Sequence, residues 1–364
     1  MRVRSVSTRG IAGLPDMTVD LQPITAIIGP RGAGKSRLLS AISWLLSGTP
    51  ALSNEVAEPE VTAELEGAAG SRRITRGPAD FPTGDVPSVL FLTARDRLPL
   101  AARNALPGGD AAPAEAMVAA IAERRLSGVE GEVLLIEEPE LMLTPQQQRH
   151  FYALLRRYGE RNQVIYTTRA PAMLDAVHYS EIVRLDVRAE GTAVRRAPAD
   201  LLTDDQRVRL EAEFDHERTE MFFATAVVLV EGQTERLALP LIFRRLGHDP
   251  DALGISIVEV GGKGNLVLAA RVLGELGIAH VLVFDSDRGR PGQRENAFIR
   301  ESVGKAPVFM LDPDFEHAAG IRDYDEKVLS AWRKFSKINA ERIPKIFKDI
   351  ATTTVDLANS GSGG

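Results

Sequence analysis

The C-terminal half of the chain alternates short apolar runs with longer amphipathic stretches. Apolar runs occupy residues 226–230, 254–260 and 279–284, and the intervening stretches 234–247 and 265–277 repeat apolar residues at helical spacing. Short apolar runs bounded by turn residues are typical of buried strands. Strands that alternate with helices of this length predict an α/β fold, in which helices cover both faces of a parallel sheet.

The N-terminal half shows the same alternation around a glycine-rich turn. An apolar strand is predicted at residues 24–28, and an amphipathic helix begins at about Lys35. Two more strands, "EVLLIE" at 132–137 and "QVIYTT" at 163–168, are predicted further along, and a turn and helix follow at 169–177. This half therefore predicts a separate α/β domain.

These patterns divide the chain into four parts. The expected parts are an N-terminal domain at 1–200, a charged connecting helix at 201–223, a second α/β domain with C-terminal helices at 224–355, and a flexible tail at 356–364. The tail is inferred from its glycine- and serine-rich end, since such composition is typical of flexible linkers.

The turn after residues 24–28 fits the pattern G-x-x-x-x-G-K-[ST]. Its glycines let successive backbone N–H groups point at phosphates, and the helix N-terminus adds a partial positive charge. Lys35 would reach the β- and γ-phosphates of ATP, and Ser36 would bind Mg²⁺. The expected nucleotide-binding residues of this loop are Gly29, Pro30, Arg31, Gly32, Ala33, Gly34, Lys35, Ser36 and Arg37.

The strand at 132–137 ends in two acids, Glu137 and Glu138. In P-loop ATPases the first acid holds Mg²⁺ and the second polarises the attacking water, which gives Glu138 the catalytic position. The order of P-loop, "EEPE" and "TTRAP" resembles the ATP-binding-cassette (ABC) ATPases of the structural-maintenance and recombination type. That resemblance covers roughly residues 1–197 and places Arg169 near the γ-phosphate, where the family carries His.

The chain departs from that ATPase family in further ways. Glu137 stands where the family has Asp, and no glutamine occurs between Gln22 and Gln146 to form the family's glutamine loop. The family's signature is reduced to "LPGGD" (106–110) or "LSGVEG" (126–131), and little room remains for a coiled-coil insert. We therefore expect ATP binding without fast turnover.

In the C-terminal half, acids follow the predicted strands. Glu231 and Asp285 end two of the strands, Asp287 comes two residues later, and Glu235 lies in the first turn of a helix. Ligands gather at the carboxyl ends of parallel strands, and residues two apart on an extended strand face the same side. Converging carboxylates raise one another's pKa values, and a divalent cation removes this conflict. Oxygen ligands alone predict Mg²⁺ or Mn²⁺.

The acids and glycines of this half also resemble a known domain. "EGQTE" (231–235), the glycines at 261–262 and "DSD" (285–287) are similar to the Toprim domain of topoisomerases, primases and some nucleases. An ABC-type ATPase followed by Toprim resembles the overcoming-lysogenisation-defect (OLD) family of ATP-associated endonucleases, over nearly the whole chain. That family carries one more acid and a downstream lysine, for which the candidates are Glu316 and Lys345, with Lys348 and Lys263 as poorer matches.

The OLD resemblance implies two-metal hydrolysis of DNA phosphodiester bonds. One cation would activate water and the other would stabilise the leaving oxygen, while Lys345 would neutralise charge in the transition state. ATP would gate access to DNA by pairing two ATPase heads. A homodimer is expected, formed through the ATPase heads or through the Toprim domains. The resemblance assigns Glu231, Asp285 and Asp287 to one ion and Glu235 with Glu316 to the other.

Composition narrows the expected partners. The chain of 364 residues has a net charge of −6, so DNA would have to meet metal ions or local basic clusters such as 72–76 and 286–294. Cysteine is absent, and no apolar run reaches the length of a signal peptide or membrane span. We expect a cytoplasmic protein without a membrane partner.

Other readings remain open at this point. A nucleotide-dependent clamp or sensor that binds DNA or a protein partner would explain the altered ATPase motifs. A topoisomerase would need a nucleophilic tyrosine, for which Tyr324 is a candidate, although no strand-passage domain is evident. A primase is disfavoured because no zinc ribbon is present.

Overall fold

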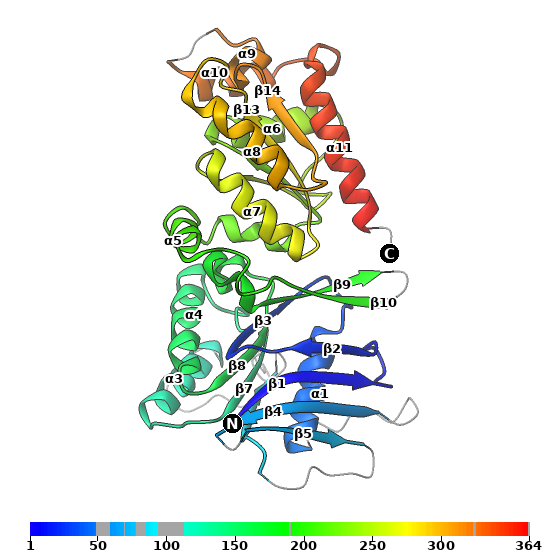
Figure 1. Cartoon of the computed structure of the whole chain (residues 1–364), viewed down its shortest axis with the longest axis vertical. Coiled ribbons are helices and arrows are strands. Elements are labelled where there is room, and N and C mark those ends of the chain that lie inside the picture. The colour runs from blue at the N-terminus through cyan, green and yellow to red at the C-terminus, as the bar shows by residue number, and fades with distance from the viewer. Residues whose placement is uncertain are drawn as a thin grey trace. The chain divides into compact units, whose positions relative to one another are not determined.

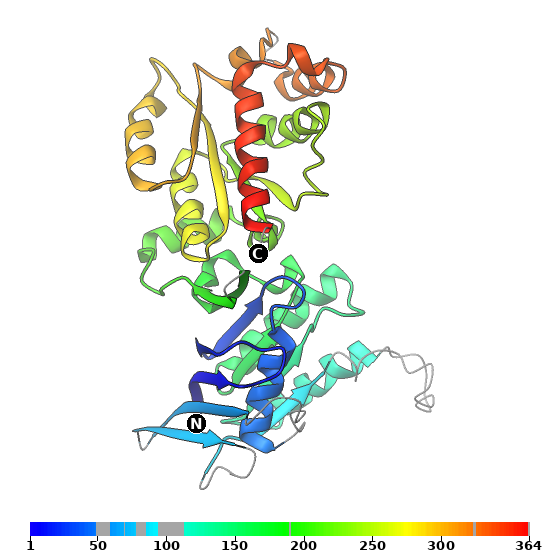
Figure 2. The same ribbon diagram turned by 90° about the vertical axis from the view of Figure 1, so that its right-hand side faces the viewer.

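The computed structural model describes residues 1–48, 59–68, 70–77, 85–93, 113–188, 191–322 and 325–362. The chain forms two compact units. The first contains Met1–Leu174 and Ser180–Arg196, and the second contains Asp175–Tyr179 and Ala197–Gly364. In Figure 1 and Figure 2 the first unit runs from blue to green and the second from green to red.

One sheet of the first unit is antiparallel. Its strand order is β2-β1-β4-β5, with β1 at Arg2–Arg9, β2 at Met17–Asp20, β4 at Glu60–Gly67 and β5 at Gly70–Arg76. Along β4 the side chains of Val61, Ala63 and Leu65 are buried and their neighbours are more exposed. This two-residue period is expected for a sheet that packs one face on a core.

The second sheet of the first unit carries the glycine-rich loop. Its order is β10-β9-β3-β8-β7-β6, and it is parallel except for the antiparallel β9–β10 pair. The central strands are buried along their whole length, as expected for parallel strands covered on both faces. The bounds are β3 Ile24–Ile28, β6 Val89–Leu92, β7 Val133–Glu137, β8 Gln163–Thr167, β9 Ile182–Arg188 and β10 Gly191–Arg196.

Three α-helices of the first unit are described: α1 (Lys35–Ser47), α3 (Pro113–Leu126) and α4 (Pro145–Gly159). Helix α1 contacts strands of both sheets, so its apolar side chains join them into one core. The helix predicted after "QVIYTT" is instead two 3-10 turns, η1 (Pro171–Met173) and η2 (Ala176–Glu181). An α-helix cannot run through because the backbone of Leu174 is extended.

The sheet of the second unit is parallel throughout, so the predicted parallel α/β arrangement is confirmed. Its order is β12-β11-β13-β14. The bounds are β11 Ala226–Val230, β12 Ile255–Glu259, β13 Ala279–Asp285 and β14 Val308–Leu311. The two central strands, β11 and β13, end at the same edge, because Val230 pairs in register with Val283.

Helices pack on this sheet from both sides (Figure 1). Helices α6 and α11 share an apolar core with alternate residues of β11 and β13, while α7 contacts the same strands from outside that core. The bounds are α5 Asp204–Glu213, η3 Arg218–Phe223, α6 Gln233–Arg245, α7 Lys263–Glu275, η4 Pro291–Arg294, α8 Glu295–Ser302, α9 Phe315–Ala319, α10 Lys327–Phe335, η5 Ala340–Arg342 and α11 Lys345–Ser362.

Two expected segments differ in the structure. The connecting helix is broken, since α5 ends where Phe214 turns extended, and η3 is a separate turn. The flexible tail is helical as far as Ser362, because α11 continues through it and buries Ala358. None of the described helices combines the length and apolarity needed to cross a bilayer.

Candidate functional sites

The loop between β3 and α1 has the backbone that its glycines predict. Gly29, Gly32 and Gly34 adopt positive φ angles of 141°, 86° and 91°. At Gly29 a Cβ atom would lie 2.3 Å from the backbone oxygen of Leu185 on β9, so no larger residue fits there without a shift of the backbone. The loop thus packs tightly against the neighbouring strand.

The amine of Lys35 lies inside this loop. Its Nζ donates hydrogen bonds to the carbonyl oxygens of Gly29 (2.7 Å) and Pro30 (2.8 Å). Burial, together with the positive charge of nearby Arg169, lowers the pKa of Lys35 to about 8. Ala33 is also buried, whereas the exposed residues of the predicted loop are Pro30, Arg31, Gly32, Ser36 and Arg37.

The acids after β7 lie close to Lys35. Glu138 has a positive φ of 47° and its backbone N–H donates to the carbonyl of Thr167 at 3.0 Å. Its carboxylate lies 3.1 Å from Nε of Arg169, while Glu137 ends β7 opposite Thr167. The P-loop lysine, the second acid and Arg169 are therefore brought together as the sequence predicts.

Glu140, which the sequence analysis did not single out, belongs to the same site. It accepts hydrogen bonds from the hydroxyl of Thr168 (2.9 Å) and the backbone N–H of Arg169 (2.7 Å). Burial raises the pKa of Glu140. The only signal in the sequence was the third acid of "EEPE".

Of the two candidate signature segments, Leu106–Asp110 lies outside the described residues, and 126–131 forms the turn after α3.

In the second unit, Glu231 and Asp285 meet at the carboxyl edge of the sheet. Glu231 directly follows β11 and Asp285 ends the neighbouring β13. A carboxylate oxygen of Glu231 accepts a hydrogen bond from the backbone N–H of Asp285 at 3.4 Å. The predicted convergence of these two acids therefore holds.

Glu235 and Glu316 complete a buried acidic cluster with Glu231 and Asp285. Burial, together with the nearby carboxylates of Asp285, Glu231 and Glu316, raises the pKa of Glu235 to about 8. Burial likewise raises the pKa of Asp285 to about 7, with Glu231 and Glu316 as the next causes. Burial also raises the pKa of Glu231, an effect that Lys263 opposes.

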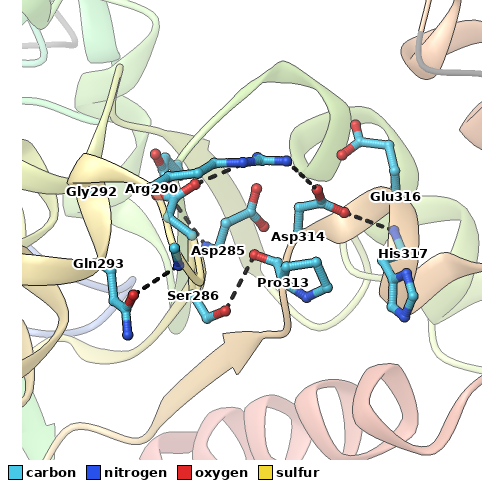
Figure 3. Close-up of polar contacts among 12 residues, drawn as sticks. Asp285, Ser286, Arg290, Gly292, Gln293, Pro313, Asp314, Glu316 and His317 are labelled. Atoms are coloured by element: carbon cyan, nitrogen blue, oxygen red, sulfur yellow. Dashed lines mark hydrogen bonds and ion pairs between the residues drawn. The ribbon is translucent and has the colours of Figure 1, made fainter.

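The loop after β14 supplies the far side of the cluster. Glu316 is buried in α9, and its carboxylate lies 3.6 Å from Nζ of Lys327. Asp314 accepts a hydrogen bond from the backbone N–H of His317 at 2.9 Å and thereby caps α9. Figure 3 shows Arg290 reaching the carboxylate of Asp314, at 3.4 Å. The carboxylate of Asp314 also contributes to the raised pKa of Asp285.

Asp287 does not lie as the sequence predicts. Strand β13 ends at Asp285, and Asp287 has a positive φ of 49°, so the two acids do not share one face of an extended strand. Its carboxylate instead accepts a hydrogen bond of 2.6 Å from the buried amine of Lys263. Lys263 also donates to Oδ1 of Asn296 (3.0 Å) and to the carbonyl of Gly292 (3.3 Å).

The lysines differ from the order of preference given by the sequence. Of the three candidate lysines, Lys263, ranked as a poor match, is the one that the described contacts join to an acid of the predicted set, and the signal was its place after "VGG" at the start of α7. Lys345 is exposed at the start of α11. Among the described residues, no hydrogen bond or ion pair joins Lys345 to the cluster.

The predicted basic clusters are partly neutralised. Arg288 contacts Asp312 at 2.5 Å, and Arg290 contacts Asp314 and, at 3.8 Å, Asp287. On β5, Arg73 pairs with Glu64 of β4. Tyr324, the candidate nucleophile, lies outside the described residues.

The donor set of the cluster fits a divalent cation in its chemistry. Oδ1 of Asp285 is buried and has no hydrogen-bond partner among the residues that the structure describes, and the surrounding carboxylates offer only oxygen. An orphaned oxygen among like charges is the situation that a hard cation relieves. Within the described part of the chain, however, no three His, Cys, Asp or Glu side chains are placed to hold a metal ion as they stand. Some side-chain movement would have to accompany binding.

The second unit matches a known family of domains, and two nucleases are similar in sequence to part of the chain. The family model "Overcoming lysogenization defect protein-like, TOPRIM domain" matches residues 222–287. The chain is 34% identical over 214 residues to the OLD nuclease of Thermus scotoductus, an alignment that covers 52% of this chain and 40% of that protein. It is 28% identical over 161 residues to the Old nuclease of Escherichia phage P2, covering 43% of this chain and 28% of that protein. The chain thus covers less than half the length of either relative.

Solved structures give weaker likenesses. The SMC head domain from Thermotoga maritima is similar over 54% of this chain and all of that one, with 14% identity and a TM-score of 0.37. The C-terminal region of the Xanthomonas campestris OLD protein is similar over 39% of this chain and 98% of that one, with 20% identity and a TM-score of 0.33. Neither score supports an argument about function. The domain match and the two nucleases confirm that the chain resembles the overcoming lysogenization defect proteins and has their Toprim type of domain in its second unit.

Proposed function

We propose that the protein is an ATP-binding, divalent-metal-dependent DNA endonuclease of the OLD type. The observation that carries the proposal is the buried, unpartnered oxygen of Asp285 within a group of carboxylates at one sheet edge. Since converging carboxylates repel one another and cost stability, their presence is best explained by a cation that joins them in the working protein. The resemblance to OLD nucleases supports hydrolysis of phosphodiester bonds as the reaction.

Each acid has a place in this proposal. Glu231 and Asp285 would hold one Mg²⁺ or Mn²⁺, and Glu235 with Glu316 would hold a second. Bound there, a divalent cation would activate water and stabilise the leaving oxygen of the scissile phosphate. Asp287 would join Glu231 and Asp285 only on release from Lys263, which holds its carboxylate in the described conformation. Lys345 remains the proposed neutraliser of transition-state charge.

ATP would bind the loop between β3 and α1 and regulate the nuclease. Lys35 lies where it can exchange its two carbonyl partners for phosphate oxygens, and the first-unit acids lie beside it. Glu137 would hold Mg²⁺ and Glu138 would polarise water, with Arg169 near the γ-phosphate. Slow hydrolysis, pairing of two ATPase heads in a homodimer, and a further protein partner belong to the same proposal.

The decisive experiment is cleavage of supercoiled plasmid DNA with Mg²⁺ or Mn²⁺, with and without ATP. We expect the native protein to nick or linearise the plasmid, and Asp285→Ala to lose at least about 100-fold in rate, by analogy with removal of a group that stabilises transition-state charge. Glu301→Ala, an exposed acid on α8, is the matched control and should cleave normally. Lys35→Ala separates nucleotide dependence from the cleavage chemistry. Undiminished cleavage by Asp285→Ala would exclude the assignment.

A nucleotide-dependent DNA clamp or sensor without nuclease activity is the second candidate. It is favoured by the ion pair between Lys263 and Asp287 and by the lack, in the described residues, of a preformed metal geometry. The same plasmid experiment distinguishes the two functions. A clamp would retain ATP-dependent DNA binding and give no cleavage with either metal.

A further inference from the structure

A basic segment follows the acidic cluster in the second unit. Residues 327–348 contain seven lysines and arginines and one acid, Glu341, although the chain as a whole has a net charge of −6. We call α10 and the residues that follow it to Lys348 the basic α10 surface. Its basic residues are Lys327, Arg333, Lys334, Lys337, Arg342, Lys345 and Lys348.

Helix α10 presents an exposed apolar stripe beside these charges. Trp332 is 51% exposed and Leu329, three residues earlier, is 38% exposed. Residues three and four apart are neighbours on a helix, so Arg333 flanks the same stripe. The opposite side of α10 is anchored by Ala331 and Phe335, which are buried. Trp332 is therefore not required by the core of the unit.

Several charges of the surface lack acidic partners. Lys337, Arg342 and Lys345 are exposed, and in the described part of the chain none of them forms an ion pair. Lys334 donates to the backbone carbonyl of Gly320 and Lys348 to that of Glu341, and neither has an acidic partner among the described residues. Such unpaired cations remain available to a polyanion.

The surface begins at the acidic cluster. Lys327, the first residue of α10, lies 3.6 Å from the carboxylate of Glu316, which contributes to the raised pKa of Asp285. A chain that lay along α10 would consequently have one part at the cluster and another beside Trp332. The contacts belong to one compact unit.

We infer that the basic α10 surface binds an unpaired segment of the nucleic-acid substrate, with Trp332 stacked on a base and the cations on the backbone. This inference rests on the proposed nuclease function and names the form of its substrate. An exposed aromatic ring among cations fits a single strand better than a duplex, because the face of a base is available for stacking only when the base is unpaired. Backbone charge neutralisation makes such binding depend strongly on salt.

Fluorescence provides a direct test, because the chain has two tryptophans. Trp44 is buried in the first unit, so a Trp44→Phe protein leaves Trp332 as the only indole. This variant, combined with Asp285→Asn to suppress cleavage, is titrated with single-stranded oligothymidylate and with a duplex of equal length in the presence of Mg²⁺. We expect the single strand to quench Trp332 fluorescence and the duplex to have much less effect.

Matched variants in the Asp285→Asn background identify the surface by anisotropy of a labelled single strand. Trp332→Ala should weaken binding about tenfold, in the range found for base–aromatic stacking, and Trp332→Phe should retain most of the affinity. Lys337→Glu should weaken binding and reduce its salt dependence. Lys305→Glu, the same charge change at another exposed site in the second unit, should leave affinity unchanged.

Three results would overturn the inference. They are unchanged affinity of Trp332→Ala, equal quenching by duplex and single strand, and a change of oligomeric state in Trp332→Ala, which would identify the stripe as a contact between copies. Because binding is measured without cleavage, failure here leaves the plasmid result standing. Binding as expected without plasmid cleavage would instead contradict the nuclease function alone.

Discussion

Lys263 is one of the positive charges at the acidic edge of the second unit, beside Lys327 and Arg290. Its amine is buried, and it holds Asp287, Asn296 and the carbonyl of Gly292 together. The carboxylate of Asp287 is mostly buried as well. A buried charge that loses its partner is strongly destabilising, whereas replacement of both partners costs much less. The ion pair therefore fixes the loop after β13. A small movement of this loop would change which acids could hold the proposed divalent cation.

We expect Lys263→Met to lower the free energy of unfolding of the second unit by about 3 kcal/mol, because Asp287 is left as an uncompensated charge beside other acids. Addition of Asp287→Asn should recover part of this loss. Urea denaturation of both variants measures the difference, with Lys305→Met as the exposed-lysine control. A double variant no more stable than Lys263→Met would show that the charge of Asp287 is not the cause.

His280 makes the stability of the second unit depend on pH. It lies on β13, its Nδ1 is 2.8 Å from the carbonyl oxygen of Ile278, and burial lowers its pKa below the ordinary 6.5. In the unfolded chain the imidazole takes up a proton near its ordinary pKa, whereas the folded unit resists the charge. The contribution of His280 to stability is therefore complete above about pH 6.5 and falls as the pH drops below that value.

We expect His280→Gln to weaken this acid dependence. The free energy of unfolding should fall less steeply between neutral pH and about pH 5 in the variant than in the native protein, since an amide does not titrate. Denaturant melts at a series of pH values measure it. Parallel curves for the two proteins would mean that other groups dominate the acid response.

At the scale of elements, the sequence predicts best where local signals agree. The strand at Ile24–Ile28, the glycine turn and the helix from Lys35 were all predicted, because an apolar run, positive-φ glycines and an amphipathic stretch specify the same unit. The four-stranded antiparallel sheet was not predicted. Polar residues alternate along its strands, so the sequence of these strands is hard to distinguish from that of a loop. The strands also pair across long sequence separations, as Val6 does with Ala63.

The sequence predicts which acids gather at the sheet edge but not the contacts that hold each side chain. The acids at strand ends were found because a parallel sheet brings those ends together. The turn of Asp287 away from the strand could not be predicted, since it is stabilised by Lys263, twenty-four residues earlier. The role of Glu140 likewise depends on Thr168, on another strand's end. Spacing alone does not reveal such tertiary partners.

Glycine substitutions in the β3–α1 loop test how tightly it packs. Gly29→Ala should lower the free energy of unfolding of the first unit by about 3 kcal/mol, since positive φ and a clash with the backbone of Leu185 add together. Gly32→Ala should cost only about 1 kcal/mol, because its Cβ atom would meet nothing within 4 Å. Trp44 fluorescence during denaturation reports both values. Equal losses would argue against the close contact at Gly29.

Helix α11 is held by aromatic packing. The ring of Phe347 lies with its centroid 5.2 Å from that of Phe315 and 5.6 Å from that of Phe335, so three helices meet at this residue. Phe347→Ala should destabilise the second unit by about 4 kcal/mol through the cavity that it leaves. Phe298→Ala, at a position 59% exposed, should cost less than about 0.5 kcal/mol. Thermal unfolding of the two variants provides the comparison.

At the scale of the whole molecule, each unit is assembled from separate stretches of chain. The path changes unit at 174/175, at 179/180 and again at 196/197. The short stretch Asp175–Tyr179 thus belongs to the second unit, where the buried hydroxyl of Tyr179 donates to the carbonyl of Ala199 (3.2 Å) and accepts from the backbone N–H of Leu202 (3.1 Å). The proposed nucleotide-binding loop and the acidic cluster of the β11–β13 edge therefore lie on different units of an interrupted chain.

Tyr179→Ala should destabilise the second unit by about 3 kcal/mol, because a buried aromatic ring and two hydrogen bonds are lost. The first unit should be affected less. Trp332 fluorescence in a Trp44→Phe background reports the second unit, and Trp44 in a Trp332→Phe background reports the first. Identical shifts of both midpoints would show that the two units unfold as a single cooperative block.

The interrupted path also limits how such a gene can be rearranged. A fragment that starts at Ala197 encodes the sheet and the acidic cluster of the second unit. It lacks Tyr179, whose hydroxyl is hydrogen-bonded to Ala199 and Leu202. Conversely, a fragment that stops at Leu174 omits β10 and also β9, against which Gly29 is packed. No single cut in the chain therefore yields both units intact, so genetic exchange of one unit alone would need more than one junction.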